Sequence, residues 1–370
     1  MSVLLKKPIF DTVSNSELVE QIEAKKKCKK KLPTWFKNAR IYYPKKLNIE
    51  QTSSEITANY KSQIVSGKSL IDLTGGFGVD SLFLSKKIDT VFHCEIDENL
   101  SEIAGHNFKV MGVKNIETFP EDGISFLRRN TARFDWLFID PSRRTNLKGK
   151  VFQLSHCLPD VTAHLDLFFR KSDAILIKTA PLLDITKGIS ELKKVREVHI
   201  LAVANDVKEI LWVLSKSANG SIEVKTRNFQ KDFEQDFNFI FSDEKQLVSN
   251  FSEPLTYLYE PNAAIMKSGG FKVLGKKYDL QKLHPNTQLY TGDQLIDFPG
   301  RRFLVEAVVP YSSKKIKQLD IKKANITVRN FPLSVAEIRK KHKILDGGAQ
   351  YLFFTSTQQR KRVLIRAHKV

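Results

Sequence analysis

The sequence has little cysteine, no long apolar run and no P-loop. Cys28, Cys94 and Cys157 lie far apart in the 370 residues and form no Cys-x-x-Cys pair. This usage favours free thiols in a reducing compartment, so we expect a cytoplasmic protein without a metal site. No apolar run reaches the roughly 20 residues that span a bilayer, and the N-terminal segment lacks the pattern of a signal peptide. We therefore expect no membrane partner.

The excess positive charge lies at the two ends of the chain. Residues 1–50 hold twelve Lys and Arg against five Asp and Glu, and residues 300–370 hold seventeen against four, within a net charge of +19. The middle of the chain is close to neutral. Segregation of this kind favours a polyanionic partner, and the alternative is an aid to solubility. A chain of this length predicts two or three domains.

One stretch, residues 69–80, organises the rest. Leu70, Ile71 and Leu73 form a short apolar run typical of a strand that is buried on both faces of a parallel sheet. A glycine-rich turn, 74–78, follows, and a helical pattern begins at Asp80. Glycines in such a turn allow positive φ and the close approach of a ligand. Strand, glycine turn and helix together predict a nucleotide-binding α/β domain.

The turn does not match the best-known nucleotide motifs. No Gly-Lys-Ser/Thr follows the glycines, and Ser81 stands where a dinucleotide fingerprint has its third glycine. Acidic residues do follow the next strand, at Glu95 and Asp97. An acidic side chain at the tip of a second strand can accept hydrogen bonds from ribose hydroxyls. Capping of the following helix is the structural alternative for both residues.

The motifs resemble those of a known enzyme class in their order. Four segments look like the ordered motifs of class I S-adenosylmethionine (SAM) methyltransferases. They are residues 72–78, the strand tip at 95–97, residues 121–123 and residues 140–143. Thr52–Ala58, with its spacing to the glycine turn, resembles the trimethylguanosine synthase-type and other RNA-modifying branches. The resemblance implies SAM as cofactor and an α/β fold: a Rossmann-like, doubly wound sheet with an N-terminal helical arm and a smaller C-terminal α+β (ferredoxin-like/THUMP-like) region.

The resemblance also implies which residues bind SAM. The glycine turn would face its methionine part, Glu95 beside Ile96 the ribose, and Asp122 beside Gly123 the adenine amine. Asp72 ends the first strand, and Thr52 lies over the pocket. Asp72 and Asp122 have a structural alternative as caps of local turns. The implied cofactor residues are thus Asp72, Thr74, Gly75, Gly76, Phe77, Gly78, Glu95, Ile96, Asp122, Gly123 and Thr52.

A second motif follows the fourth strand. Asp140, Pro141, Ser142 and Arg143 stand where amino-group methyltransferases carry Asn/Asp-Pro-Pro-aromatic, and we predict these four as the catalytic residues. In that motif the first side chain and a following carbonyl accept hydrogen bonds from the NH₂ group to be methylated. Ser142 replaces the second proline and Arg143 the aromatic residue, which leaves the substrate open. Arg143 or Arg144 would stack on a base, bind a phosphate or form an ion pair.

We predict that the whole chain divides into four parts. We expect a basic helical arm (1–49), a methyltransferase domain (50–230), a connecting ferredoxin-like α+β segment (231–299) and a basic THUMP-like domain (300–370). In the second part, Thr52 and Glu55 would form a capping box, and 207–215 would be a helix between strands at 198–204 and 222–227. The last of these strands would be antiparallel. In the fourth part, strands and helices alternate and Ser334 and Glu337 form a capping box.

These observations predict a SAM-dependent methyltransferase that modifies a base nitrogen in structured rRNA or tRNA. RNA would be held through the basic ends, 25–46 and 301–369. For the lysine run at 25–31 the alternative is a solvated helix end. Two other functions stay open: methylation of a protein or small molecule, and RNA binding without turnover on a methyltransferase fold. Cys157, expected in a helix, is more typical of a small buried residue than of a nucleophile.

Overall fold

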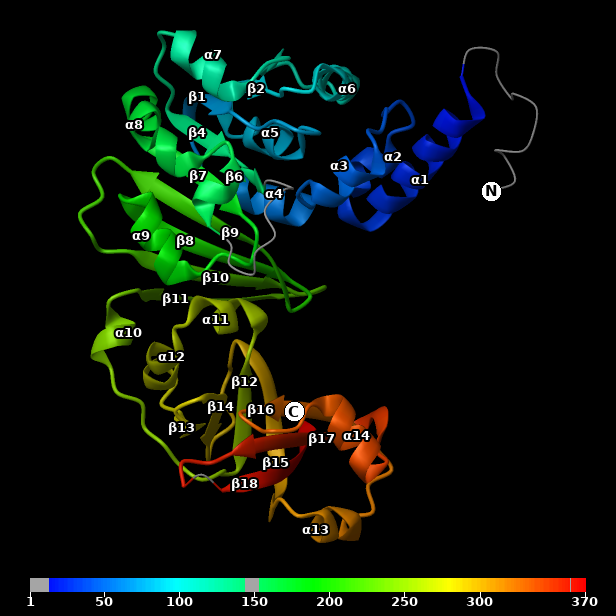
Figure 1. The fold of residues 1–370 in the computed structure, drawn as a ribbon, viewed down its shortest axis with the longest axis vertical. Helices are drawn as coiled ribbons and strands as arrows, with labels where there is room; N and C mark the ends of the chain where they lie inside the picture. The colour runs from blue at the N-terminus through cyan, green and yellow to red at the C-terminus, as the bar shows by residue number, and fades with distance from the viewer. Residues whose placement is uncertain (1–12, 144–152, 360) are drawn as a thin grey trace. The chain divides into compact units, whose positions relative to one another are not determined.

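The computed structural model describes residues 13–143, 153–359 and 361–370, and the chain forms two compact units (Figure 1). The first unit comprises Met1–Glu197 and Glu209–Gly220, and the second comprises Val198–Lys208 and Ser221–Val370. The predicted fold class is confirmed: a large, mostly parallel sheet is joined by helices, and a smaller α+β region follows it.

The first unit is built on a parallel sheet. Its strands lie in the order β9-β7-β4-β1-β2-β3, so the chain starts in the middle, moves to one edge and then crosses to the other side. All these neighbours pair in parallel except β7 and β9, which are antiparallel. The strands are β1 (Gly67–Asp72), β2 (Ile88–Cys94), β3 (Ile116–Phe119), β4 (Trp136–Ile139), β7 (Ala174–Thr179) and β9 (Asp206–Ser215).

Helices cover both faces of this sheet, as alternate residues of β2 show. The Phe92 ring contacts Phe126 of α7, whereas the next residue, His93, lies edge-on to Phe108 of α6. Successive side chains of a strand point to opposite faces, so α6 and α7 lie on opposite sides. The helices of this unit after β1 are α5 (Val79–Leu84), α6 (Glu98–Val110), α7 (Gly123–Arg129), α8 (Val161–Lys171) and α9 (Ile185–Leu192).

The N-terminal helices pack on the α5/α6 side. They are α1 (Asn15–Lys31), α2 (Pro33–Lys37), α3 (Lys46–Gln51) and α4 (Glu55–Ser62). Ala24, Cys28 and Trp35 share one apolar core with residues of α5 and α6. Residues 13–49 of the predicted arm are therefore anchored to the unit by burial, and residues 1–12 lie outside the described part of the chain.

Two local predictions in this unit are wrong. Residues 207–215 are not a helix: they belong to β9, which is the antiparallel strand beside β7. Their continuous apolar run suits a buried strand as well as a buried helix, so periodicity could not separate the two. The capping box at Thr52 is also wrong, because Ser54 caps α4 and Thr52 ends α3. The Glu55 carboxylate instead accepts hydrogen bonds from the amide and hydroxyl of Thr34.

The second unit contains most of β8 (Val195–Val203), with β10 (Glu223–Phe229) antiparallel to β11 (Glu234–Ile240). A seven-stranded sheet of order β13-β14-β12-β15-β18-β17-β16 follows. The predicted alternation of strands and helices after residue 300 is confirmed, as is the capping box of Ser334 and Glu337. The remaining elements are α10 (Asp243–Gln246), β12 (Tyr257–Pro261), α11 (Ala263–Ser268), α12 (Phe271–Lys277), β13 (Gln281–His284), β14 (Thr287–Gly292), β15 (Gly300–Pro310), α13 (Ser313–Gln318), β16 (Lys323–Arg329), α14 (Val335–His342), β17 (Leu345–Ser356) and β18 (Arg362–Lys369).

Candidate active site

The glycine turn after β1 is shaped by its neighbours. Gly76 and Gly78 have φ of 57° and 80°, a region that side-chain-bearing residues rarely adopt. A Cβ on Gly75 would lie 2.2 Å from the His93 ring, and one on Gly78 would lie 2.3 Å from the Phe108 ring. Around Gly76 only the Thr74 carbonyl comes within 4 Å of such a position. The turn therefore rests on β2 and α6 and leaves open space at Gly76.

Beneath the turn lie two buried titratable side chains. Asp72 accepts hydrogen bonds from the Thr74 amide (3.0 Å) and from the Ser81 hydroxyl, which also contacts Nδ1 of His93 (3.0 Å). Burial raises the pKa of Asp72 to about 7 and lowers that of His93 to about 4. Asp72 is 1 % exposed, so this predicted cofactor residue supports the turn from below.

The acidic tip of β2 closes against the glycine turn. One oxygen of the Glu95 carboxylate accepts a hydrogen bond from the Gly76 amide (2.7 Å), and the other accepts one from the Asp97 amide (2.9 Å). A carboxylate oxygen can accept a second hydrogen bond, so both retain capacity for a ligand hydroxyl. The Asp97 carboxylate caps α6. Ile96 is 73 % exposed, which leaves an apolar surface beside Glu95.

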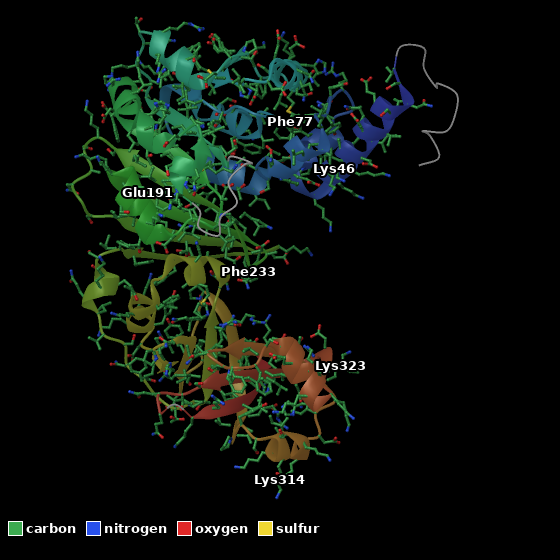
Figure 2. The ribbon with its side chains drawn as sticks, in the orientation of Figure 1. Lys46, Phe77, Glu191, Phe233, Lys314 and Lys323 are labelled. Carbon is green, nitrogen blue, oxygen red and sulfur yellow. The ribbon has the colours of Figure 1, made fainter. Side chains whose placement is uncertain are left out.

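The other predicted cofactor residues have different surroundings. Asp122 caps α7 by accepting bonds from the amide and hydroxyl of Ser125, which matches the structural alternative for this residue. Gly123 packs so closely that a Cβ would lie 2.4 Å from the Leu73 carbonyl oxygen. Phe77, which is labelled in Figure 2, is 3 % exposed. Its ring centroid lies 6.2 Å from that of Trp35. The side chain of Phe77 is therefore part of the core, and only its backbone belongs to the turn.

Asp140 meets the glycine turn at the carboxyl edge of the sheet. Its amide donates a hydrogen bond of 2.7 Å to the Thr74 hydroxyl, which ties the end of β4 to the end of β1. Pro141 is buried. Ser142 and Arg143 form β5 (Ser142–Arg143), which pairs with β6 (Cys157–Leu158) after the short helix η1 (Leu154–His156). Arg144 lies outside the described residues.

Cys157 was expected in a helix, and this is wrong. It lies in β6, where it is the backbone partner of Arg143. The cis peptide bond between Leu158 and Pro159 follows directly, and α8 begins only at Val161. Cys157 is fully buried, which agrees with its interpretation as a small core residue.

Lys178 was not among the predicted site residues, and its ammonium forms an ion pair with the carboxylate of Asp140. Burial by itself lowers the pKa of Lys178, but the carboxylates of Asp140, Asp80 and Glu209 outweigh it and raise the pKa above its ordinary value. Lys178 is therefore charged. A signal was present in the sequence: a lysine near the end of an apolar strand, 174–179, is costly to bury unless it is paired.

A second buried lysine lies close by in the same unit. Lys61 of α4 is fully buried, and its ammonium contacts Ser53 (2.9 Å), Glu209 (2.6 Å) and Asp80 (3.0 Å). The other oxygen of Asp80 accepts a hydrogen bond from Ser53 (2.7 Å). The contacts with Ser53 and Glu209 are hydrogen bonds, and the contact with Asp80 is an ion pair. We call Lys61, Asp80, Glu209 and Ser53 the Lys61 cluster; it links α4, α5 and β9.

The described residues thus offer the groups that SAM binding needs. The open space at Gly76 admits a ligand against the backbone, Glu95 retains acceptor capacity, and Ile96 offers an apolar face for a base. Asp140 is joined to the same turn by its hydrogen bond to Thr74. In the described part of the chain no set of three or more His, Cys, Asp or Glu side chains is placed to hold a metal ion. Nor does any described helix have the length and apolar character needed to cross a membrane.

One solved structure resembles the whole chain. It is a crystal structure named "putative methyltransferase" from Porphyromonas gingivalis W83, with 30 % identity and a TM-score of 0.93, covering 100 % of this chain and 94 % of that one. This chain belongs to the same methyltransferase family. Family models match two segments of this chain: a ferredoxin-like domain at residues 257–299 and a THUMP domain-like region at residues 300–369.

Two curated relatives match a shorter part of this family member. A tRNA (guanine(26)-N(2))-dimethyltransferase from Methanobrevibacter smithii is 29 % identical over 108 residues, which cover 28 % of each chain. An uncharacterized RNA methyltransferase from Mycoplasma mobile is 28 % identical over 122 residues, covering 29 % of this chain and 34 % of that protein. The matches thus span about a third or less of the relatives' own length.

Proposed function

We propose that this protein transfers a methyl group from SAM to an exocyclic base nitrogen in structured RNA. The observation that carries the proposal is the hydrogen bond between the Asp140 amide and the Thr74 hydroxyl. It joins the Asp-Pro motif to the glycine turn, so a base amine at Asp140 would lie beside a cofactor held at Gly76. Two curated relatives are named tRNA and RNA methyltransferases, which supports RNA as the substrate class.

Methyl transfer from SAM requires alignment of the base nitrogen with the methyl group and does not require an acid catalyst. Bound SAM supplies an electrophilic methyl group on a cationic sulfur. The Asp140 carboxylate accepts a hydrogen bond from the target NH₂ and so directs the nitrogen lone pair at that methyl carbon. The nitrogen would use this lone pair for the new N–C bond while the bond from that carbon to sulfur breaks and its electron pair stays on the departing thioether, and the nitrogen would then lose one proton to solvent. Proximity and orientation of this kind are worth up to ~7–11 kcal/mol in well-oriented systems.

Exposed cations on each unit give the RNA phosphates partners. On α1, Lys26, Lys29 and Lys30 are exposed, whereas Lys31 donates to the carbonyls of Ile49 and Glu50 (2.8 Å each) and so fastens α1 to α3. On the second unit, the exposed cations come from α13, β16 and α14, and Figure 2 labels two of them. They include Lys314, Lys315, Lys323, Lys340 and Lys341.

The test is a methyl-transfer assay with radiolabelled SAM. Total RNA and total protein from cells that lack this gene are incubated separately with the protein, with Asp140→Ala and with Asp173→Ala. Asp173 is a matched control because it is an exposed carboxylate of a surface ion pair with Arg133. We expect label in RNA, about 10²-fold less with Asp140→Ala, and no change with Asp173→Ala.

Each other outcome has a definite meaning. Label in the protein fraction alone would overturn RNA as the substrate while keeping methyl transfer. No label in either fraction, with SAM binding measured by calorimetry, would contradict transfer to a macromolecule. RNA binding should also weaken steeply between low and moderate salt, because phosphate contacts release counterions.

A further inference from the structure

The strand register brings Lys178 and Asp140 together. β4 and β7 are parallel neighbours, and Ile139 pairs with Ile177. Asp140 follows Ile139, and Lys178 follows Ile177, so the two residues lie at the same level of adjacent strands. Side chains at the same level of adjacent strands point to the same face of the sheet. The ion pair between them follows from this register and needs no loop rearrangement.

Lys178 lies between the substrate edge and the buried interior. Its side chain is 10 % exposed, against 32 % for Asp140. The charged groups that face it are Asp140 after β4, Asp80 of α5 and Glu209 of β9; the last two also hold Lys61. Asp80 and Glu209 form their ion pairs with Lys61. They therefore favour the charged form of Lys178 by electrostatic attraction, while the ion pair of Lys178 itself is with Asp140.

We infer that Lys178 is a positioning residue that holds the Asp140 carboxylate in place for the target amine, an inference that rests on the proposed function. Lys178 binds Oδ2 of Asp140, so Oδ1 is the oxygen left for a substrate N–H. The Asp140 amide is fixed by Thr74 and one carboxylate oxygen by Lys178, which together fix the direction of Oδ1. A carboxylate fixed at two points loses little freedom when the amine arrives.

The experiment compares Lys178→Met, Lys178→Arg and the control Lys187→Met in the full-length protein, with the RNA fraction as acceptor. Lys187 forms an ion pair with Glu191 at 3.8 Å in which the two side chains are 35 and 21 % exposed, so its loss removes a lysine without touching Asp140. We expect Lys178→Met to lower kcat about 10²-fold. KM for RNA and the Kd for SAM should change less than threefold. Lys178→Arg should regain part of kcat.

A double-mutant cycle separates this role from a purely structural one. If Lys178 acts through Asp140, Lys178→Met should cost little further activity in the Asp140→Asn background. Additive losses, or equal kcat for Lys178→Met and the wild type, would overturn the inference while leaving the proposed function standing. A loss of kcat matched by an equal loss of SAM affinity would also overturn it. Wild-type protein that labels no RNA would instead contradict the proposed function, and the inference with it.

Discussion

Both units bury charge, and they do so in opposite ways. In the first unit the Lys61 cluster is closed: the side chains of Lys61, Glu209 and Asp80 are 0, 3 and 10 % exposed. In the second unit the buried carboxylate of Glu260, 4 % exposed, is held by Arg301 and by Arg329 (2.8 Å), which are 39 and 38 % exposed. We call these three residues the Glu260 cluster.

The two clusters differ in how their cations meet solvent. The hydrogen bonds and ion pairs described for the Lys61 ammonium are all with side chains of the buried cluster, which therefore fixes α4, α5 and β9 to one another beside Lys178. The Glu260 cluster carries one more positive than negative charge and keeps its arginines partly in water. Its arginines are therefore accessible to solvent and to an anion, whereas the Lys61 ammonium is fully buried.

The largest effect should come from opening the closed cluster. Lys61→Met leaves the buried carboxylates of Asp80 and Glu209 without their cation, and we expect it to cost about 3–5 kcal/mol of unfolding free energy. All three tryptophans, Trp35, Trp136 and Trp212, lie in the first unit, so tryptophan fluorescence in urea reports on that unit. Lys27→Met, which removes the exposed partner of Glu50, should leave the midpoint unchanged. Equal midpoints for both variants would refute the distinction between buried and exposed pairs.

A second effect is the pH dependence of stability that two buried carboxylates, Asp72 and Asp80, are expected to cause. Burial raises the pKa of Asp72 to about 7, whereas for Asp80 the attraction of Lys61 and Lys178 outweighs burial and lowers it. The native protein therefore retains the Asp72 proton that the unfolded chain loses near pH 4. The stability that this contributes is present below that pH and is lost as pH rises from about 4 to about 7, at up to about 1.4 kcal/mol per pH unit.

Asp72→Asn should remove this pH dependence, so the difference in stability between variant and wild type should change steadily across that window in urea titrations. Asp80→Asn should show the opposite sign, because the stability that an ionised Asp80 contributes is lost as pH falls through its lowered pKa. Parallel pH profiles for wild type and Asp72→Asn would show that Asp72 is ionised in the native protein.

A smaller effect is expected for the open cluster. Glu260→Gln removes the carboxylate, but Arg301 and Arg329 can turn to water, so we expect a loss of about 1–3 kcal/mol. The second unit has no tryptophan, and hydrogen exchange of β12 and β15, which pair through Glu260 and Arg301, is the suitable measurement. The matched control is Glu306→Gln, whose carboxylate pairs with Arg366 and His368 at the surface. Faster exchange with the control than with Glu260→Gln would contradict this ranking.

The smallest effect should lie in the salt dependence of RNA binding. Replacement of the three exposed lysines Lys26, Lys29 and Lys30 by glutamine should lower the slope of log K against log salt by about 2–3. Filter binding at several salt concentrations measures it. The control replaces Lys87, Lys109 and Lys114, which are equally exposed on the same unit. An identical fall in slope for both triplets would mean that α1 carries no special contact with RNA.

Much of the fold could be predicted because the hydrophobic pattern and the capping residues of many segments are typical of the elements that they form. The glycine turn follows an apolar run that is buried in β1, and the predicted capping box of Ser334 and Glu337 begins α14. The failure at 207–215 has a physical cause, since a fully buried strand and a buried helix both read as continuous apolar sequence. The capping box at Thr52 failed because Ser54 offers an equally good hydroxyl two residues later.

The site was less accessible to sequence reasoning. Glycine spacing and the Asp-Pro motif are local, and they led to Gly76 and Asp140. Lys178 and Glu209 come from strands that are distant in sequence, and only the sheet order places them beside Asp140 and Lys61. The capping role of Asp122 could be foreseen from Ser125 three residues later, whereas the use of Glu95 to hold the Gly76 amide depends on how β1 and β2 align.

The most direct test of the account is to identify the methylated atom. RNA from cells that lack this gene is methylated with the protein and SAM that carries a deuterated methyl group, digested to nucleosides and analysed by mass spectrometry. The account predicts a deuterated methyl group on an exocyclic base nitrogen, absent with Asp140→Ala and strongly reduced with Lys178→Met. A deuterated methyl group on ribose or on a base carbon would contradict the role given to Asp140.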